Sequence, residues 1–139
     1  MTRWLLDASV LLAAEDRDDA SHADARRLLE GTGRLATLDL ALYEVTNVAI
    51  VAWKDAAAAR RLRGVIAALA DDGGLVRAEP SLLETAAELA HVHGISAYDA
   101  AYVAAAAAVR AELVSCDVRA IVARGLARLP ADAARPDAT

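Results

Sequence analysis

The sequence predicts an α/β sandwich with a mainly parallel central sheet, built as one domain. Short apolar runs alternate along the chain with longer helical segments, which is typical of parallel strands connected by helices. The chain has 139 residues and is 57% hydrophobic. This is the size of one domain, with enough apolar material to bury a core without disulfides.

Five short segments are the expected strands, so we expect a sheet of about five strands. The first is Trp4-Leu5-Leu6, which ends at Asp7. The others follow at wide intervals, as strands separated by helices should, at residues 35–38, 75–77, 113–116 and 127–129.

Helical segments fill the intervals between these runs. Asp39, Ser81 and Ser96 stand where helices begin, and such side chains cap free backbone N–H groups. Gly94 and Gly125 stand where helices end. The expected helices lie at residues 8–15, 22–30, 40–53, 55–72, 80–93, 97–111 and 118–124.

The domain is expected to span residues 1–129. Residues 130–139 hold two prolines and mostly small or charged side chains, so we expect a disordered tail there. No apolar run approaches the length of a bilayer span or of a signal-peptide core. We therefore expect a cytoplasmic protein without a membrane partner.

Charge and cysteine content exclude several classes. Fifteen basic and twenty acidic residues give a net charge of −5, which does not fit a protein that grips nucleic acid by a broad basic surface. A small basic patch, or a metal ion that bridges to phosphate, stays compatible with this charge. The single cysteine rules out a disulfide framework and a cysteine zinc site.

Four otherwise apolar segments each carry one charged residue, and in each segment that residue is an acid. No basic side chain stands beside any of them in the same segment. Burial of an unpaired carboxylate is costly, so such groups are usually partnered, protonated or bound to metal. The four acids are Asp7, Glu44, Asp99 and Asp117.

The predicted strands bring these acids together. Asp7 ends one strand and Asp117 follows another, and ligands of parallel α/β sheets bind beyond the carboxyl ends of the strands. Glu44 and Asp99 lie near the starts of helices that can begin at the same edge. Several oxygen ligands without Cys or His suit Mg²⁺ or Mn²⁺. The chemistry implied is phosphodiester hydrolysis, in which the metal activates water and neutralises the phosphate.

Helix capping offers a second interpretation of the three aspartates. Asp7 and Asp117 can each be the N-cap of a following helix, and Asp99 stands three residues after Ser96, as in a capping box. Glu44 sits inside an apolar helix and not at its cap. Both interpretations stay open for each aspartate taken singly.

Four segments resemble the motifs of a known family. Asp7-Ala8-Ser9 is similar to the opening motif of PIN-domain nucleases, and Glu44 with Asn47 is similar to the second. Residues 96–102 around Asp99 and residues 113–117, with Ser115 before Asp117, are similar to the third and fourth. Their order, their spacing and the chain length resemble the VapC toxins of bacterial toxin–antitoxin pairs, and the resemblance extends to about Leu129.

The resemblance implies a three-layer α/β/α sandwich and an endoribonuclease that uses Mg²⁺ or Mn²⁺ to cut tRNA or a ribosomal RNA loop. It implies that the four acids form the catalytic metal site. Ser9, Asn47 and Ser115 would then orient the ligands. Arg110-Ala111-Glu112 departs from the family, which often has glycine in this helix-to-strand turn.

The resemblance also implies partners. VapC toxins form homodimers and are blocked by a VapB-like antitoxin that lies in an apolar groove. We expect Trp53, Leu62, Val65 and Ile66 to lie at or near such a partner surface, with a place in the core as the alternative.

A basic cluster and two tyrosines also carry open alternatives. Arg60, Arg61 and Arg63 form the densest basic cluster, which either contacts RNA phosphates or is a solvated helix face paired with acids. Tyr98 and Tyr102 flank Asp99, and each either stacks on a base or packs in the core.

Two other functions compete with the nuclease. One is a PIN-fold interaction module without catalysis, which loss of any acid would favour. The other is a phosphoaspartyl protein, which expects paired acids near the first strand and a lysine after a later strand. Here Asp7-Ala8-Ser9 follows the first strand, and Lys54 closes a helix. From the residues alone, RNA and DNA both stay open as substrates.

Overall fold

Four parallel strands form the centre of the protein. The computed structural model describes residues 2–135, and the strand order across the sheet is β3-β2-β1-β4. Leu5 of β1 pairs with Ala36 on one side and with Leu113 on the other, so the first strand of the chain is an interior strand of the sheet. The strands are β1 (Arg3–Leu6), β2 (Arg34–Leu38), β3 (Leu75–Val76) and β4 (Glu112–Val114).

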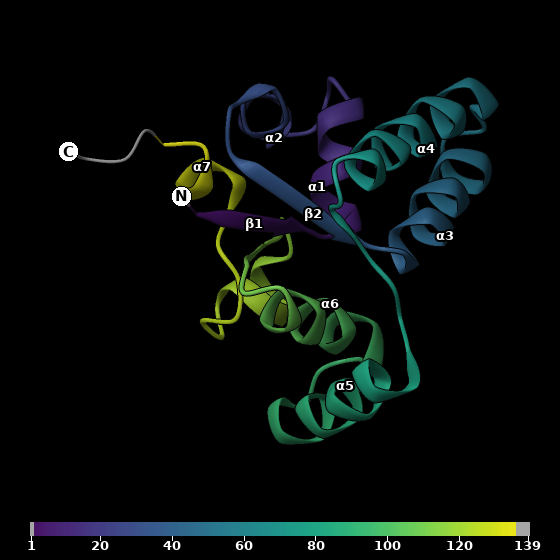
Figure 1. Cartoon of the computed structure of the whole chain (residues 1–139). Helices are drawn as coiled ribbons and strands as arrows, with labels where there is room; N and C mark the ends of the chain where they lie inside the picture. The colour runs from purple at the N-terminus through teal and green to yellow at the C-terminus, as the bar shows by residue number, and fades with distance from the viewer. Residues whose placement is uncertain (1, 136–139) are drawn as a thin grey trace.

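Helices cover both faces of this sheet, which confirms the predicted α/β sandwich (Figure 1). One layer consists of α1 (Ala8–Glu15), α2 (His22–Glu30), α3 (Leu40–Asn47) and α4 (Ala56–Asp71). A π-helical turn, η1 (Val48–Ala52), continues α3. The other layer consists of α5 (Pro80–His93) and α6 (Ala97–Ala108). A second π-helical turn, η2 (Val118–Val122), and a short helix, α7 (Pro130–Ala133), follow β4.

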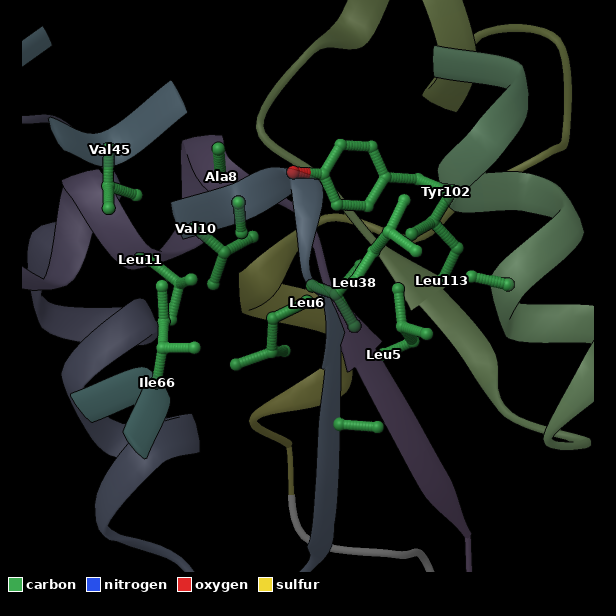
Figure 2. Packing of buried hydrophobic residues seen from close by; sticks show 14 of the residues in the cluster. Leu5, Leu6, Ala8, Val10, Leu11, Leu38, Val45, Ile66, Tyr102 and Leu113 are labelled. Atoms are coloured by element: carbon green, nitrogen blue, oxygen red, sulfur yellow. The ribbon is translucent and has the colours of Figure 1, made fainter. Parts of the chain in front are cut away.

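The core lies where the helical layers meet the sheet. Leu5, Leu6, Leu38 and Val114 are completely buried, as expected for parallel strands covered on both faces. Figure 2 shows Leu5, Leu6 and Leu38 in the space between the strands and the flanking helices. Residues 104–108 are five consecutive alanines and lie within α6. Alanine suits this position because it combines high helix propensity with a side chain small enough for close packing.

Two details of the predicted fold differ from the structure. Within residues 2–135 the sheet has four strands, because residues 127–129 contribute only one isolated bridge, between Val114 and Arg128. The disordered tail was predicted to begin at residue 130, whereas Pro130 and Ala133 are buried within α7, which packs beside α2. Residues 136–139 of that predicted tail lie outside the described residues.

Over the described part of the chain, none of the helices combines the length and apolar character needed to span a bilayer.

The turn after α6, where the PIN-domain nucleases often have glycine, has Arg110 in a strained backbone conformation. Arg110 has φ 55°, in the left-handed region, and the N–H groups of Arg110 and Ala111 donate to the carbonyls of Ala107 and Ala106. This is a Schellman motif, in which the left-handed position is usually glycine. Gly94 occupies the matching position after α5, with φ 65°. Arg110 therefore holds a conformation that costs a side-chain-bearing residue free energy.

We expect Arg110→Gly to stabilise the protein. Relief of left-handed strain outweighs the added entropy of the unfolded chain, for a gain of about 0.5–1 kcal/mol in the free energy of unfolding. Urea unfolding followed by circular dichroism measures it. Gly94→Ala is the matched control and is expected to lose about 1 kcal/mol, because the added methyl meets open space and only backbone strain changes. An Arg110→Gly protein less stable than the wild type would contradict this account.

Candidate active site

The four acids lie at the carboxyl end of the sheet, on four different elements. Asp7 follows β1 directly, and its backbone N–H donates to the carbonyl of Val114 at 3.2 Å. Asp117 follows β4 by three residues and caps η2. Glu44 stands in the second turn of α3, and Asp99 in the first turn of α6. The parallel topology thus brings together residues from both ends of the chain.

Asp7 is the buried member of the group, with 6% of its surface exposed. Burial raises its pKa to about 6, because the charged form loses hydration. The hydroxyls of Ser115 and Ser9 and the backbone N–H of Val10 oppose this rise, and the charge of Glu44 adds to it. The Ser9 hydroxyl donates to Oδ1 of Asp7 at 2.5 Å. Asp7 is therefore held in place by neutral donors.

Two serine hydroxyls join the start of α1 to the loop after β4. The N–H of Cys116 donates to Oγ of Ser9 at 2.9 Å, and the N–H of Asp117 donates to Oγ of Ser115 at 3.0 Å. The two hydroxyl oxygens are 3.5 Å apart. These bonds fix the backbone that carries Asp117 against the helix that carries Asp7.

Glu44 has a partner that the sequence analysis missed. The hydroxyl of Tyr102 donates to Oε1 of Glu44 at 2.6 Å, across the sheet edge from α6 to α3. Tyr102 is 3% exposed, and Figure 2 shows its hydroxyl directed away from α6, beyond Leu38. Burial and the neighbouring carboxylate raise the pKa of Tyr102 strongly, so its hydroxyl stays a donor. Tyr102 lies three residues after Asp99 on the same helix, and this i, i+3 spacing was the available signal.

Helix capping and a shared site turn out to be compatible. Asp7 and Asp117 both accept a capping N–H bond on Oδ1, from Val10 at 3.3 Å and from Ala120 at 2.9 Å. Ser96 caps α6 by accepting the N–H of Asp99 at 3.0 Å. A carboxylate has two oxygens, so a cap leaves capacity to bind a further group.

Electrostatic repulsion links the four acids into one array. The charge of Glu44 raises the pKa of Asp7, the charge of Asp99 raises the pKa of Glu44, and the charge of Asp117 raises the pKa of Asp99. For Glu44 and Asp99, burial is the larger cause. Among residues 2–135, no salt bridge involves any of the four. Such an array calls for a cation.

The donors fit Mg²⁺ or Mn²⁺ by chemistry. The array offers carboxylate oxygens with serine hydroxyls beside them, and hard divalent ions prefer oxygen ligands. In the described part of the chain, however, no three His, Cys, Asp or Glu side chains are arranged closely enough to hold an ion. The array therefore has the charge and the atoms of a metal site, while closure around an ion requires the carboxylates to move.

The other predicted site residues, Asn47 and the arginines of the basic cluster, make no hydrogen bond or ion pair with the four acids among residues 2–135. Asn47 is exposed on α3 and lines a shallow hollow with Tyr43 and Ile50. Arg61 pairs with Glu15, with Nε and Oε1 2.6 Å apart, which matches the alternative of a solvated, acid-paired helix face for this residue.

The other two arginines of the predicted basic cluster lie on the exposed side of α4. Arg60 and Arg63 are both exposed, and Nη1 of Arg63 is 3.5 Å from Oγ1 of Thr46. Arg63 also borders the hollow of Asn47.

The predicted partner surface needs correction. Leu62 and Ile66 are 2% and 1% exposed, because they lie on the inward face of α4. They belong to the core and cannot meet a partner. Trp53 and Val65 are partly buried against the same core. The exposed apolar side chains of this layer are on α3 and η1 instead, where Tyr43, Ile50 and Val51 are 78%, 46% and 63% exposed.

Comparison with known proteins agrees with the observed fold. A family model described as PIN domain matches residues 4–126. Among solved structures, the sarcin-ricin loop cleaving toxin VapC20 of Mycobacterium tuberculosis superimposes with a TM-score of 0.71 at 22% identity, covering 88% of this chain and 95% of that one. A toxin-antitoxin complex from Klebsiella pneumoniae gives 0.70 at 18% identity, with 91% and 96% covered.

A third structure, PAE2754 from Pyrobaculum aerophilum, gives a TM-score of 0.70 at 25% identity, with 96% and 87% covered. No curated protein matches the chain. At these identities the structural matches show a shared fold.

Replacement of Asp7 by Asn is expected to stabilise the metal-free protein as the pH rises. The folded-state pKa of about 6 lies above the ordinary value of 3.8 for an aspartate. Stability from this group is thus fully present below about pH 4 and is lost as the pH rises through 6. The loss reaches at most about 3 kcal/mol, and Asn avoids it. Thermal unfolding in EDTA from pH 4.5 to 8 should show a Tm difference between Asp7→Asn and wild type that widens with pH.

The exposed Asp18 provides the control for this experiment. Asp18→Asn should leave the pH profile of the Tm unchanged. A constant difference between Asp7→Asn and wild type at every pH would refute the assigned burial of the charge.

A double-mutant cycle on Tyr102 and Glu44 is expected to show coupling. Tyr102→Phe removes the donor and Glu44→Gln removes the charge, and a hydrogen bond to a charged group contributes about 1.5–3 kcal/mol. Half-burial of Glu44 places the expected coupling at the lower end, about 1–2 kcal/mol in free energy of unfolding. Additive effects of the two substitutions, measured by urea unfolding, would contradict the contact. Tyr98→Phe with Glu44→Gln is the control pair, because Tyr98 is 65% exposed.

Proposed function

The chain belongs to the PIN domain family, and from this membership we propose that it is an endoribonuclease toxin that hydrolyses RNA phosphodiester bonds with Mg²⁺ or Mn²⁺. The observation that carries the proposal is the array of four acids at the carboxyl edge of the sheet, coupled by charge and without a basic partner. A binding module without catalysis has no use for carboxylates that destabilise one another.

In this proposal Asp7, Asp99 and Asp117 hold the ion. Glu44 holds a second ion or orients the attacking water. The ion, when bound, supplies the charge that neutralises the phosphate and activates water. Hydrolysis is expected to leave 5′-phosphate and 3′-hydroxyl ends.

The remaining residues of the site act on the carboxylates. Ser9 and Ser115 keep Asp7 and the Asp117 backbone in register, through the hydroxyl contacts described above. Tyr102 keeps Glu44 on the inward side of α3. Asn47, one turn after Glu44, is proposed to orient the ligands, and Arg60 and Arg63 are proposed to contact RNA phosphates. Residues that orient ligands commonly change metal affinity or activity by about 10–100-fold when replaced.

The family and its solved neighbours support a proposal for the substrate class and the partners. VapC20 is described as cleaving the sarcin-ricin loop, and the Klebsiella protein was solved as a toxin-antitoxin complex. For this chain we propose tRNA or a ribosomal RNA loop as the substrate. We also propose a cognate VapB-like antitoxin as inhibitor, a homodimer as the working form and the cytoplasm as the location.

Cleavage of end-labelled total tRNA is the decisive test. Wild-type protein free of antitoxin is expected to give discrete cuts with Mg²⁺ or Mn²⁺ and none with EDTA. Asp99→Asn is expected to lose at least about 100-fold in rate, because it removes a proposed ligand and not merely its support. Asp18→Asn, prepared in parallel, should cut like the wild type.

The outcomes separate the candidate functions. Equal activity of wild type and Asp99→Asn would mean that the cleavage comes from a contaminant or from another site. If wild type is inert on tRNA, on ribosomes and on DNA with every metal, while still binding an antitoxin, the non-catalytic module would replace the nuclease.

A further inference from the structure

Two of the five aromatic side chains of this protein are exposed, and both stand beside the acidic array. Tyr43 is 78% and Tyr98 is 65% exposed. The other three are packed: Tyr102 is buried, and Trp4 and Trp53 pack against the core. A chain with so few aromatic residues has thus placed two of them in water, where they contribute little to the stability of the core.

The two tyrosines occupy equivalent positions relative to the acids. Tyr43 precedes Glu44 on α3, and Tyr98 precedes Asp99 on α6. Consecutive helical residues point in different directions, so each tyrosine lies to the side of an acid that faces the site. The hydroxyl of Tyr102, three residues after Asp99 on α6, donates to Glu44 on α3 at 2.6 Å, so the two helices meet at the array. Since α3 and α6 cover opposite faces of the sheet (Figure 1), the two tyrosines border the array from two sides.

The surroundings of Tyr43 add a phosphate-binding group. Tyr43 lines the shallow hollow between α3, η1 and α4, with Thr46 and Arg63 on its rim. Arg63 is exposed, and its guanidinium is 3.5 Å from the hydroxyl of Thr46. A cation beside an exposed ring can bind a phosphate while the ring stacks on the adjoining base.

Electrostatics favours stacking as a source of RNA affinity. The acids repel the phosphate backbone, and the whole chain carries a net charge of −5. Stacking of a base on an aromatic ring does not depend on net charge, and it tolerates any base. Bases within a duplex are already stacked on each other, so only unpaired nucleotides can use such rings.

We propose that Tyr43 and Tyr98 are stacking platforms that hold unpaired nucleotides on either side of the phosphate to be cut. This inference rests on the proposed nuclease function and names two residues that position its RNA substrate. A second copy of the chain is the competing occupant for the hollow, because Ile50 and Val51 are exposed beside Tyr43. Tyr98 favours RNA, since its neighbours in the first turn of α6 are the small or charged Ala97 and Asp99.

Fluorescence anisotropy with a 5′-labelled, unstructured 12-nucleotide RNA tests the proposal. Calcium replaces magnesium so that binding is measured apart from cleavage. Tyr43→Ala and Tyr98→Ala are each expected to weaken binding about tenfold, and Tyr→Phe at either position should stay within about twofold, because the ring is retained. Leu83→Ala is the control, since Leu83 is 51% exposed on α5. A labelled RNA duplex should bind equally to all variants.

Light scattering and cleavage assays on the same proteins complete the test. If either alanine variant binds the RNA like the wild type, or if the wild type does not bind it, the proposal is overturned. A fall in molar mass of Tyr43→Ala with unchanged RNA affinity would assign the hollow to a second copy, which also overturns it. Tenfold weaker binding in a protein that cuts no RNA would support the stacking role while refuting the nuclease. RNA cleavage by both variants with unchanged RNA affinity would support the nuclease while refuting the stacking role.

Discussion

Repulsion among four carboxylates is the constraint around which this protein is organised. Parallel strands end at a common edge, so the residues that follow β1 and β4 are forced together, and α3 and α6 add one acid each. The burial of Asp7 makes the repulsion expensive, because little water is left to screen it. An arrangement that disfavours its own charge persists only where something else is bound there, or where function requires it.

Neutral donors hold the acids of the array in place. Ser9 and Ser115 secure Asp7, and Tyr102 secures Glu44, so each buried acid is oriented by a hydroxyl. An arginine in the place of Tyr102 would hold Glu44 more strongly, but it would also satisfy the charge that a metal ion needs. Hydroxyl donors fix direction while leaving most of the negative charge available. The choice of donor is therefore part of the chemistry of the site.

The positions of the acids could be predicted from the sequence where they depend only on neighbouring residues. Asp7 and Asp117 follow short apolar runs, so their place at the strand ends was predictable from the pattern alone. The bond from Tyr102 to Glu44 was not predictable in this way, because the partners are 58 residues apart and only the packing of α6 against the sheet joins them.

The predictions of the partner surface, the fifth strand and the C-terminal tail were wrong for different reasons. Leu62 and Ile66 follow a helical period that marks a buried face, and their assignment to a partner surface came from the family and not from that period. The last strand was overestimated because the triplet Ala127-Arg128-Leu129 does not show how many backbone hydrogen bonds it will make. Pro130 marks the start of a helix as readily as the end of a domain, and only its burial distinguishes the two.

The join between Ser9 and Ser115 has a consequence for how the protein is made. These residues are 106 positions apart, and β4, which brings the second of them to β1, is the last strand of the sheet. During translation the first acid leaves the ribosome early, while the last one follows only when most of the chain has been synthesised. A growing chain, or one cut short before β4, lacks a complete array. The proposed catalytic site therefore cannot form until the ribosome has synthesised nearly the whole domain.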